Sequence, residues 1–244
     1  MINKVLLREY TAAFGVELTD EMCDRFDRYA QLLVEWNQKM NLTAIVEPDD
    51  IVLKHFADSL TALPLLPKRE GITLIDVGTG AGFPAVALLI ARPDLKVTLL
   101  DSLNKRLTFL QEVCRELGLS AQTVHARAEE GGRDSLLREA FDVATARAVA
   151  ALPVLSEYCL PFVKTGGIFL AMKGPESDAE HAQAERAIRV LGGRVKQVEH
   201  RVLPVVPKEG VEQLERRIFV IEKQQKTPNG YPRPTAKIKK GAIG

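Results

Sequence analysis

A glycine cluster follows the first strongly β-favouring run of the sequence, where a strand would turn into a helix. Asp76 precedes Gly78, Gly80 and Gly82, and Phe83 follows the last glycine. Glycines at such a turn tolerate a positive φ and let a ligand approach the backbone closely. A dinucleotide fingerprint, G-x-G-x-x-G, would need glycine at position 83. The spacing here, D-x-G-x-G-x-G, departs from that fingerprint.

The spacing of these glycines resembles the cofactor loop of S-adenosylmethionine (AdoMet) methyltransferases. AdoMet carries a sulfonium and an ammonium group and no pyrophosphate, so a carboxylate at Asp76 suits AdoMet and would repel a diphosphate. Asp101 follows Gly78 by 23 residues, at the end of the second predicted strand, where a carboxylate accepts hydrogen bonds from ribose hydroxyls. Because NAD and AdoMet both carry a ribose, Asp101 predicts nucleoside binding without choosing between them.

Strand-like and helical stretches alternate through the middle of the chain. The strand-like runs cover 72–77, 96–100, 122–125, 141–146 and 167–172. Between them, apolar residues recur at helical spacing, most clearly over 103–117. This alternation predicts βαβ units and a doubly wound α/β sandwich. A helix over 178–191 and two closing strands over 194–202 and 216–222 follow, and the loop between these strands contains Pro204, Pro207 and Gly210.

The two ends of the chain differ from this middle part. Residues 1–66 have helical spacing, with a helix from Asp20 to Met40 behind a Thr19 N-cap and another helix after Pro48. The last residues contain six Lys or Arg, no acid and three prolines, a composition typical of a mobile arm. We therefore expect three parts: an N-terminal helical segment 1–66, a cofactor-binding domain 67–222 and a basic arm 223–244.

Composition excludes several classes of protein. Hydrophobic residues make up 46% and charged residues 27% of the chain, as in ordinary globular proteins. No apolar run approaches the about 18 residues of a membrane span. Cys23, Cys114 and Cys159 form no C-x-x-C pair and suggest neither a disulfide framework nor a metal site. We expect a cytoplasmic protein, without metal or membrane contact, that acts as a monomer.

Several strings of sequence, in the same order, resemble one known family. They are NLTAI (41–45), HFADSL (55–60), LIDVGTGAGFP (74–84), RPDLKVTLLDSLNKRLTFLQEV (92–113), ATARAVAALPVL (144–155), AMKGPE (171–176) and T-P-x-x-Y-P-R (227–233). The family is the glucose-inhibited division protein B family, the bacterial 16S ribosomal RNA guanine-N7 methyltransferases. The resemblance implies a Rossmann-like class I AdoMet-dependent methyltransferase sheet with an N-terminal helical extension. It also implies a target guanine, nucleotide 527 in the 530 loop.

The resemblance implies a cofactor site at the glycine loop and after the next three strands. Gly78 and Phe83 would line the cleft, Asp101 would hold the ribose, and Ala128 with Glu129 would flank the adenine. Arg147 would lie where cofactor and target base meet. The full cofactor set is then Asp76, Gly78, Gly80, Gly82, Phe83, Asp101, Ala128, Glu129 and Arg147.

Arg147 is also the catalytic candidate. A guanidinium beside a sulfonium needs an electron-rich partner, which would be the methionine carboxylate, an RNA phosphate or guanine O6. Its alternative role is an ordinary ion pair at a strand end. No N-P-P-Y or D-P-P-Y string follows the fourth strand, and no histidine belongs to a recognisable triad. Guanine N7 has a lone pair and no proton, so we expect direct displacement without a general base, aided by in-line positioning.

Candidate contacts with the expected partner, 16S rRNA or the 30S subunit, fall in three places. The polar residues Asn41, Lys54, His55, Asp58 and Ser59 would contact RNA or join the helical segment to the sheet. Lys173 ends the fifth strand at the rim of the cleft. The arm contributes Arg233, Lys237, Lys239 and Lys240.

The overall net charge of +1 hides an uneven distribution. Residues 1–222 hold 27 basic and 32 acidic residues, whereas the arm carries +6. Such an arm makes salt-sensitive phosphate contacts. We therefore expect deletion of residues 224–244 to weaken RNA binding and to spare AdoMet binding.

Three alternatives remain open at this point. An NAD(P)-dependent oxidoreductase shares the fold and Asp101, but position 83 is not glycine and no Tyr-x-x-x-Lys signature is present. A non-catalytic ribosome-assembly RNA-binding protein on the same fold is disfavoured by the intact glycine loop. A methyltransferase acting on a small molecule or a protein would leave the basic arm without a role.

Overall fold

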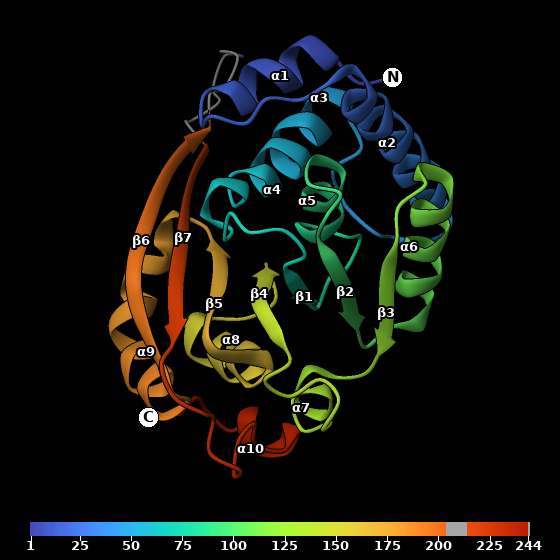
Figure 1. The fold of residues 1–244 in the computed structure, drawn as a ribbon. Coiled ribbons are helices and arrows are strands. Elements are labelled where there is room, and N and C mark those ends of the chain that lie inside the picture. Colours follow the sequence, from blue (N-terminus) through green and yellow to red (C-terminus); the bar gives the residue numbers. More distant parts are fainter. Residues whose placement is uncertain (204–213, 244) are drawn as a thin grey trace.

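One mixed β-sheet forms the centre of the molecule (Figure 1). The computed structural model describes residues 1–203 and 214–243. The sheet order is β3-β2-β1-β4-β5-β7-β6; β7 pairs antiparallel with both β5 and β6, and the other described pairs are parallel. The strands are β1 (Thr73–Val77), β2 (Lys96–Asp101), β3 (Ala121–His125), β4 (Phe141–Arg147), β5 (Val163–Lys173), β6 (Gly193–Leu203) and β7 (Leu214–Lys223).

Helices cover both faces of this sheet, because alternate strand residues point to opposite sides and both sides are apolar. Leu74 belongs to the hydrophobic cluster on one face, and the adjacent Ile75 belongs to the cluster on the other. The first face is covered by α1 (Lys4–Ala12), α2 (Asp20–Met40), α3 (Pro48–Ile51), α4 (Asp58–Leu60), α5 (Ala85–Ala91) and α6 (Asn104–Leu117). The second is covered by α8 (Leu152–Cys159) and α9 (Asp178–Val190). The predicted doubly wound α/β fold is confirmed.

The N-terminal helices form a layer on the first face. The Thr19 hydroxyl accepts a hydrogen bond from the Met22 N–H at 3.2 Å and caps α2 as predicted. After Pro48 the chain is helical through Leu60, but Val52–Ala57 forms a π-helical turn between α3 and α4. Such wide turns are frequent at functional sites. The turn carries His55.

The C-terminal segment, residues 223–243, is packed against the fold, so the predicted mobile arm is wrong for these residues. Lys223 is fully buried, and its Nζ donates to the carbonyls of Leu160 and Val163 at 2.6 and 3.1 Å. Burial lowers the pKa of Lys223 to about 8. Ile238, in the short helix α10 (Thr235–Ile238), and Ile243 are also buried. The amino-acid composition led to a wrong prediction because a few buried or hydrogen-bonded side chains, here called anchors, attach the segment to the fold, and no apolar run is needed.

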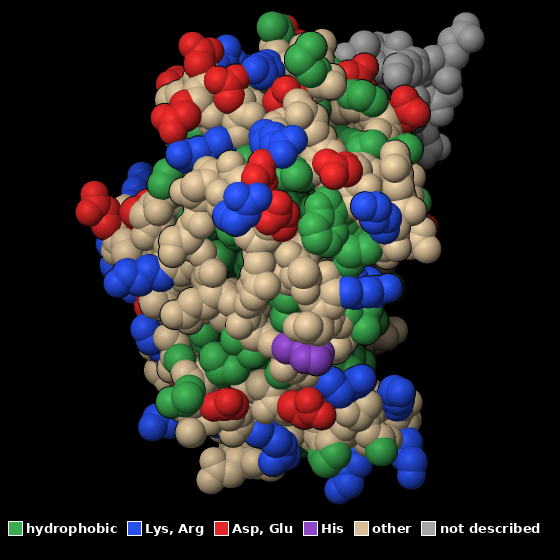
Figure 2. All heavy atoms as spheres, turned by 90° about the vertical axis from the view of Figure 1, so that its right-hand side faces the viewer, with side chains coloured by type: hydrophobic (Ala, Val, Ile, Leu, Met, Phe, Trp, Pro, Cys, Tyr) green, Lys and Arg blue, Asp and Glu red, His purple; other side chains and the backbone are tan. Residues whose placement is uncertain are grey.

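Arg233, which was predicted as an RNA contact, is one of these anchors. Its guanidinium donates to both carboxylate oxygens of Glu157 on α8, at 2.7 to 3.1 Å, and its backbone N–H donates to Oε1 at 2.7 Å. Lys237, Lys239 and Lys240 are exposed. Figure 2 shows basic and acidic side chains interspersed over one face, with mostly Lys and Arg at its lower end, the height of α10 in Figure 1.

Three further sequence-based expectations concern membrane-spanning helices, the cysteines and the loop between the last two strands. None of the helices in residues 1–203 and 214–243 is long and apolar enough to cross a membrane. Cys23, Cys114 and Cys159 are free thiols with buried side chains, as interpreted from their spacing. The predicted loop with Pro204, Pro207 and Gly210 lies outside the described residues.

Candidate active site

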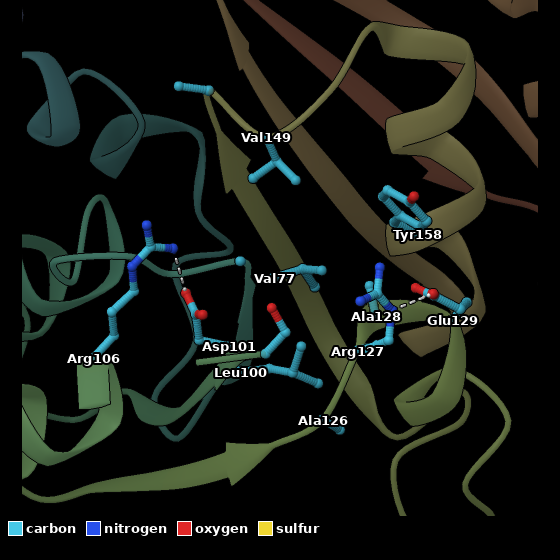
Figure 3. Close-up of a pocket in the computed structure, with 13 residues that line it drawn as sticks. Val77, Leu100, Asp101, Arg106, Ala126, Arg127, Ala128, Glu129, Val149 and Tyr158 are labelled. Atoms are coloured by element: carbon cyan, nitrogen blue, oxygen red, sulfur yellow. Dashed lines mark hydrogen bonds and ion pairs between the residues drawn. The ribbon is translucent and has the colours of Figure 1, made fainter. Parts of the chain in front are cut away.

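The first cavity of the candidate site lies at the carboxyl ends of β1 to β4 (Figure 3). It has a volume of about 280 Å³. Ligands of doubly wound sheets bind at this edge, where the strands end and the connecting loops diverge. Its wall includes Gly78, Asp101, Ala128 and Glu129, together with Val149. The structure thus brings together four of the predicted cofactor residues.

The glycine loop and Asp101 hold each other in place. The Gly80 N–H donates to Asp101 Oδ2 at 2.9 Å, and the Leu103 N–H donates to Oδ1 at 2.9 Å. Arg106, which the sequence analysis missed, forms an ion pair with Asp101 at 3.4 Å. At Gly78, where φ is +71°, a Cβ would lie 2.9 Å from Val149, so only glycine fits. The Asp101 carboxylate is therefore fixed at the pocket wall before any ligand arrives.

Asp76 does not face the pocket, so its predicted contact with the cofactor's cations is corrected. The side chain is fully buried beneath the loop. Its two oxygens accept hydrogen bonds from the hydroxyls of Thr79 at 2.6 Å and Thr145 at 2.8 Å. Burial raises the Asp76 pKa to about 6, against the lowering effect of these bonds. Asp76 shapes the loop by tying it to β4.

Gly82 and Phe83 attach the loop to the N-terminal helices and do not line the first pocket. A Cβ at Gly82, where φ is +97°, would lie 2.5 Å from the Tyr29 hydroxyl oxygen. The Phe83 ring stacks on His55 with 4.4 Å between ring centroids and on Tyr29 with 5.3 Å. Phe83 is 5% exposed and is enclosed by these neighbours.

The second cavity adjoins the first, and Ala148 lines both. Its volume is about 410 Å³. Basic side chains from four separate segments meet there, and the polar lining residues are Lys54, His55, Asp58, Arg147, Lys173 and Arg216. Arg147 lines the second cavity, directly before Ala148, which lines both cavities.

Asp58 joins two arginines at the second cavity. Arg147 Nη1 donates to Asp58 Oδ2 at 2.8 Å and to the Lys54 carbonyl at 3.0 Å. Arg216 Nε, on β7, donates to Asp58 Oδ1 at 2.8 Å. Sequence analysis missed Arg216, because 158 residues separate it from Asp58. The sequence left two roles open for Asp58, contact with RNA or joining the helical segment to the sheet. These hydrogen bonds show that Asp58 joins the helical segment to the sheet.

His55 is a neutral side chain packed under Arg147. Arg147 Nη2 lies 3.2 Å from Nδ1, and the Thr43 hydroxyl lies 2.9 Å from Nε2. A guanidinium only donates, so Nδ1 accepts and Nε2 carries the proton. Burial, together with the Arg147 charge, lowers the His55 pKa to about 3. His55 is therefore neither a cationic RNA contact nor an effective base near pH 7.

The other predicted RNA residues fall into two groups. Some lie at the edge of the second cavity, and others stabilise the local backbone. Lys54 forms an ion pair with Asp50 at 3.0 Å, and Lys173 forms one with Glu180 at 2.9 Å, both at the edge of the second cavity. Asn41 ends α2 in the left-handed conformation, with φ of 49°. The Ser59 hydroxyl donates to the carbonyl of His55 at 2.5 Å. Asn41 and Ser59 therefore have structural roles.

The strand order and the cavity at the strand ends define the fold of a Rossmann-like class I methyltransferase. Solved structures agree on the fold. A SAM-dependent O-methyltransferase from Thermotoga maritima matches with a TM-score of 0.52 and 18% identity, over 80% of this chain and 73% of that one. TrmN from Thermus thermophilus matches with a TM-score of 0.51 and 22% identity, over 70% of this chain and 53% of that one.

The chain belongs to the GidB family, described as rRNA small subunit methyltransferase G, whose family model matches residues 22–205. It is 49% identical to ribosomal RNA small subunit methyltransferase G of Acetivibrio thermocellus, over 98% of this chain and 96% of the relative. The protein of the same name from Brevibacillus brevis is 47% identical, over 95% of each chain. The family resemblance and the AdoMet cofactor predicted from the sequence are confirmed.

Proposed function

We propose that this protein transfers the methyl group of AdoMet to N7 of a guanine in 16S ribosomal RNA. The observation that carries the proposal is the pair of adjoining cavities with Ala148 in both walls. One cavity presents a carboxylate and glycine backbone to a nucleoside, and the other presents arginines to a nucleic acid. Two reactants held in adjoining cavities approach each other in a restricted geometry, which is the main catalytic device of a direct displacement.

The first cavity fits AdoMet by the chemistry of its walls. Asp101 would accept hydrogen bonds from ribose hydroxyls, and Ala128 and Glu129, which line the same cavity, would flank the adenine. Gly78, whose missing side chain leaves its backbone exposed to the cavity that it lines, would let the methionine end approach closely. Bound there, AdoMet supplies an electrophilic methyl group. The residues that line the first cavity would hold AdoMet beside Ala148, which also lines the second cavity.

The second cavity suits a methyl transfer that needs no general base. Among its described lining residues, His55 has a pKa of about 3, and Asp58 accepts bonds from two arginines. No available general base remains in this part of the chain, and N7 carries no proton that would need one. Arg147 Nε has no hydrogen-bond partner among the described residues, so it is available to donate to guanine O6 and orient the base.

The balance of charge at Asp58 also favours this reaction. Attack by a neutral guanine leaves a positive charge on the purine, which unpaired arginines would oppose. Asp58 offsets one of the two guanidinium charges beside the cavity. Arg147 can therefore orient the base at a smaller electrostatic cost to the product.

We further infer that the target is nucleotide 527 in the 530 loop, presented by 16S rRNA or the 30S subunit. The identity of the chain to small subunit methyltransferases G over nearly its whole length supports this inference. The protein would act as a monomer in the cytoplasm, where ribosomal RNA is made.

Two measurements test the proposal. S-adenosylhomocysteine should raise the melting temperature and NADH should not; the reverse result favours an oxidoreductase. The second measurement incubates the protein and labelled AdoMet with 30S subunits, or with naked 16S rRNA, from a strain that lacks this gene. Borohydride–aniline cleavage should then reveal one new N7-methylguanine at nucleotide 527. Label without such cleavage would refute N7 as the acceptor, and cleavage elsewhere would refute the assigned nucleotide.

A further inference from the structure

The C-terminal segment reaches the cofactor cavity through one side chain. The Thr235 hydroxyl, at the start of α10, donates to Oε1 of Glu129. Arg127 Nε donates to the same oxygen at 2.8 Å. Glu129 lies across the cavity from Asp101, on the side where the chain leaves β3 (Figure 3). Arg127 and Thr235, which are far from each other in the sequence, thus both donate to one carboxylate of the cavity wall.

Both side-chain donors to Glu129 bond Oε1, and no side chain of the described residues donates to the second carboxylate oxygen, Oε2. Burial alone would raise the Glu129 pKa, but the hydrogen bonds from Thr235, Arg127 and the backbone N–H of Glu129 keep it below the ordinary value. The side chain therefore stays a carboxylate near neutral pH, with Oε2 as a hydrogen-bond acceptor. An acceptor at the adenine side of the cavity is complementary to the exocyclic amino group of adenine.

Thr235 is itself held in place by the attachment of the segment. Arg138 donates to the carbonyls of Thr227 at 2.7 Å and Tyr231 at 2.9 Å. Arg133 donates to the Pro232 carbonyl at 2.8 Å. Contacts on the far side of Thr235 come from the buried side chains of Ile238 and Ile243. Because anchors lie both before and after Thr235, its hydroxyl has a defined position.

We propose that Thr235 is a positioning residue of the cofactor cavity, which sets the Glu129 carboxylate for recognition of the adenine amino group. The proposal rests on the proposed use of AdoMet at this cavity. It makes the C-terminal segment part of the cofactor site. Removal of residues 224–244 should therefore weaken AdoMet binding, contrary to the expectation drawn from composition.

Calorimetric titration with two ligands distinguishes a positioning role of Thr235 from a general effect of the substitution on the stability of the fold. The ligands are S-adenosylhomocysteine and S-inosylhomocysteine, which has an oxo group in place of the amino group. The unchanged protein should prefer the amino ligand by about tenfold or more, because the oxo group presents a lone pair to the carboxylate. Thr235→Val should weaken binding of the amino ligand about three- to tenfold, the loss of one well-placed hydrogen bond. Its affinity for the oxo ligand should hardly change.

Two further variants complete the test. Thr235→Ser keeps the hydroxyl and should restore the preference for the amino ligand. Thr108→Val makes the same substitution at an exposed position on α6 and should change neither affinity. Unchanged preference in Thr235→Val, or an equal loss of both ligands, would overturn the positioning role. Failure of the unchanged protein to bind S-adenosylhomocysteine at all would overturn the proposed function itself.

Discussion

Substitution of Asp58 by asparagine tests the charge cluster that joins the helical layer to the sheet. The carboxylate side chain is 3% exposed, and its two partners, Arg147 and Arg216, are 14% and 20% exposed. Asparagine has nearly the same volume, so the change removes the charge and one acceptor without opening a cavity. Breaking a buried ion pair from one side costs about 3–5 kcal/mol. Because the amide oxygen still accepts one bond, we expect a loss of about 3 kcal/mol in the free energy of unfolding.

The assay is thermal and urea unfolding, followed by methylation at a temperature where the variant is folded. For a chain of this size, 1 kcal/mol shifts the melting temperature by about 2–4 °C, so a fall of about 6–12 °C is expected. Methylation should fall about a hundredfold, since Arg147 loses its fixed position beside the base. Asp20→Asn is the control, because Asp20 pairs with Arg8 at the surface and is 95% exposed, where such pairs contribute little. Equal melting temperatures and equal activities for the two variants would refute this account of Asp58.

Three further predictions concern pH, the glycine loop and RNA. Because the His55 pKa is about 3 in the fold and about 6.5 when unfolded, the unfolded chain binds the extra proton and stability falls as the pH drops below about 6.5. His55→Asn should flatten the pH dependence of the free energy of unfolding between pH 6.5 and 5, and an unchanged slope would contradict the buried neutral histidine. Gly82→Ala should lower the free energy of unfolding by about 2 kcal/mol or more, because φ is +97° and the Cβ meets Tyr29, Leu110 and Val86 within 2.8 Å. Gly174→Ala, with no atom within 4 Å of its Cβ, should unfold like the unchanged protein in urea, and similar losses in both variants would count against the packing argument. Replacing Lys237, Lys239 and Lys240 by alanine should raise the KM for RNA and reduce its salt dependence, since each phosphate contact releases counterions. S-adenosylhomocysteine affinity should stay unchanged in that triple variant, and an unaltered KM would assign these lysines to solubility alone.

Local patterns in the sequence predicted most of the fold. Helical spacing placed α2 and its Thr19 cap, and alternating strands and helices predicted the doubly wound sheet. The glycine loop and Asp101 were predicted together, because both lie at strand ends and parallel strands end at one edge of a sheet. Such features depend on neighbouring residues and on a few general packing rules, so they can be read from one chain.

The partners of the charged side chains were decided only by the tertiary structure. Arg216 and Asp58 are far apart in sequence, and their contact exists because β7 inserts between β5 and β6 beside the helical layer. Arg147 meets the same carboxylate from β4, 89 residues after Asp58 in the sequence. The sequence by itself determined which residues stand at the strand ends; only the packed layers determined which cavity each one faces. A basic, proline-containing composition could not show that residues 223–243 are held in place, because a handful of long-range hydrogen bonds and two isoleucines suffice to anchor them.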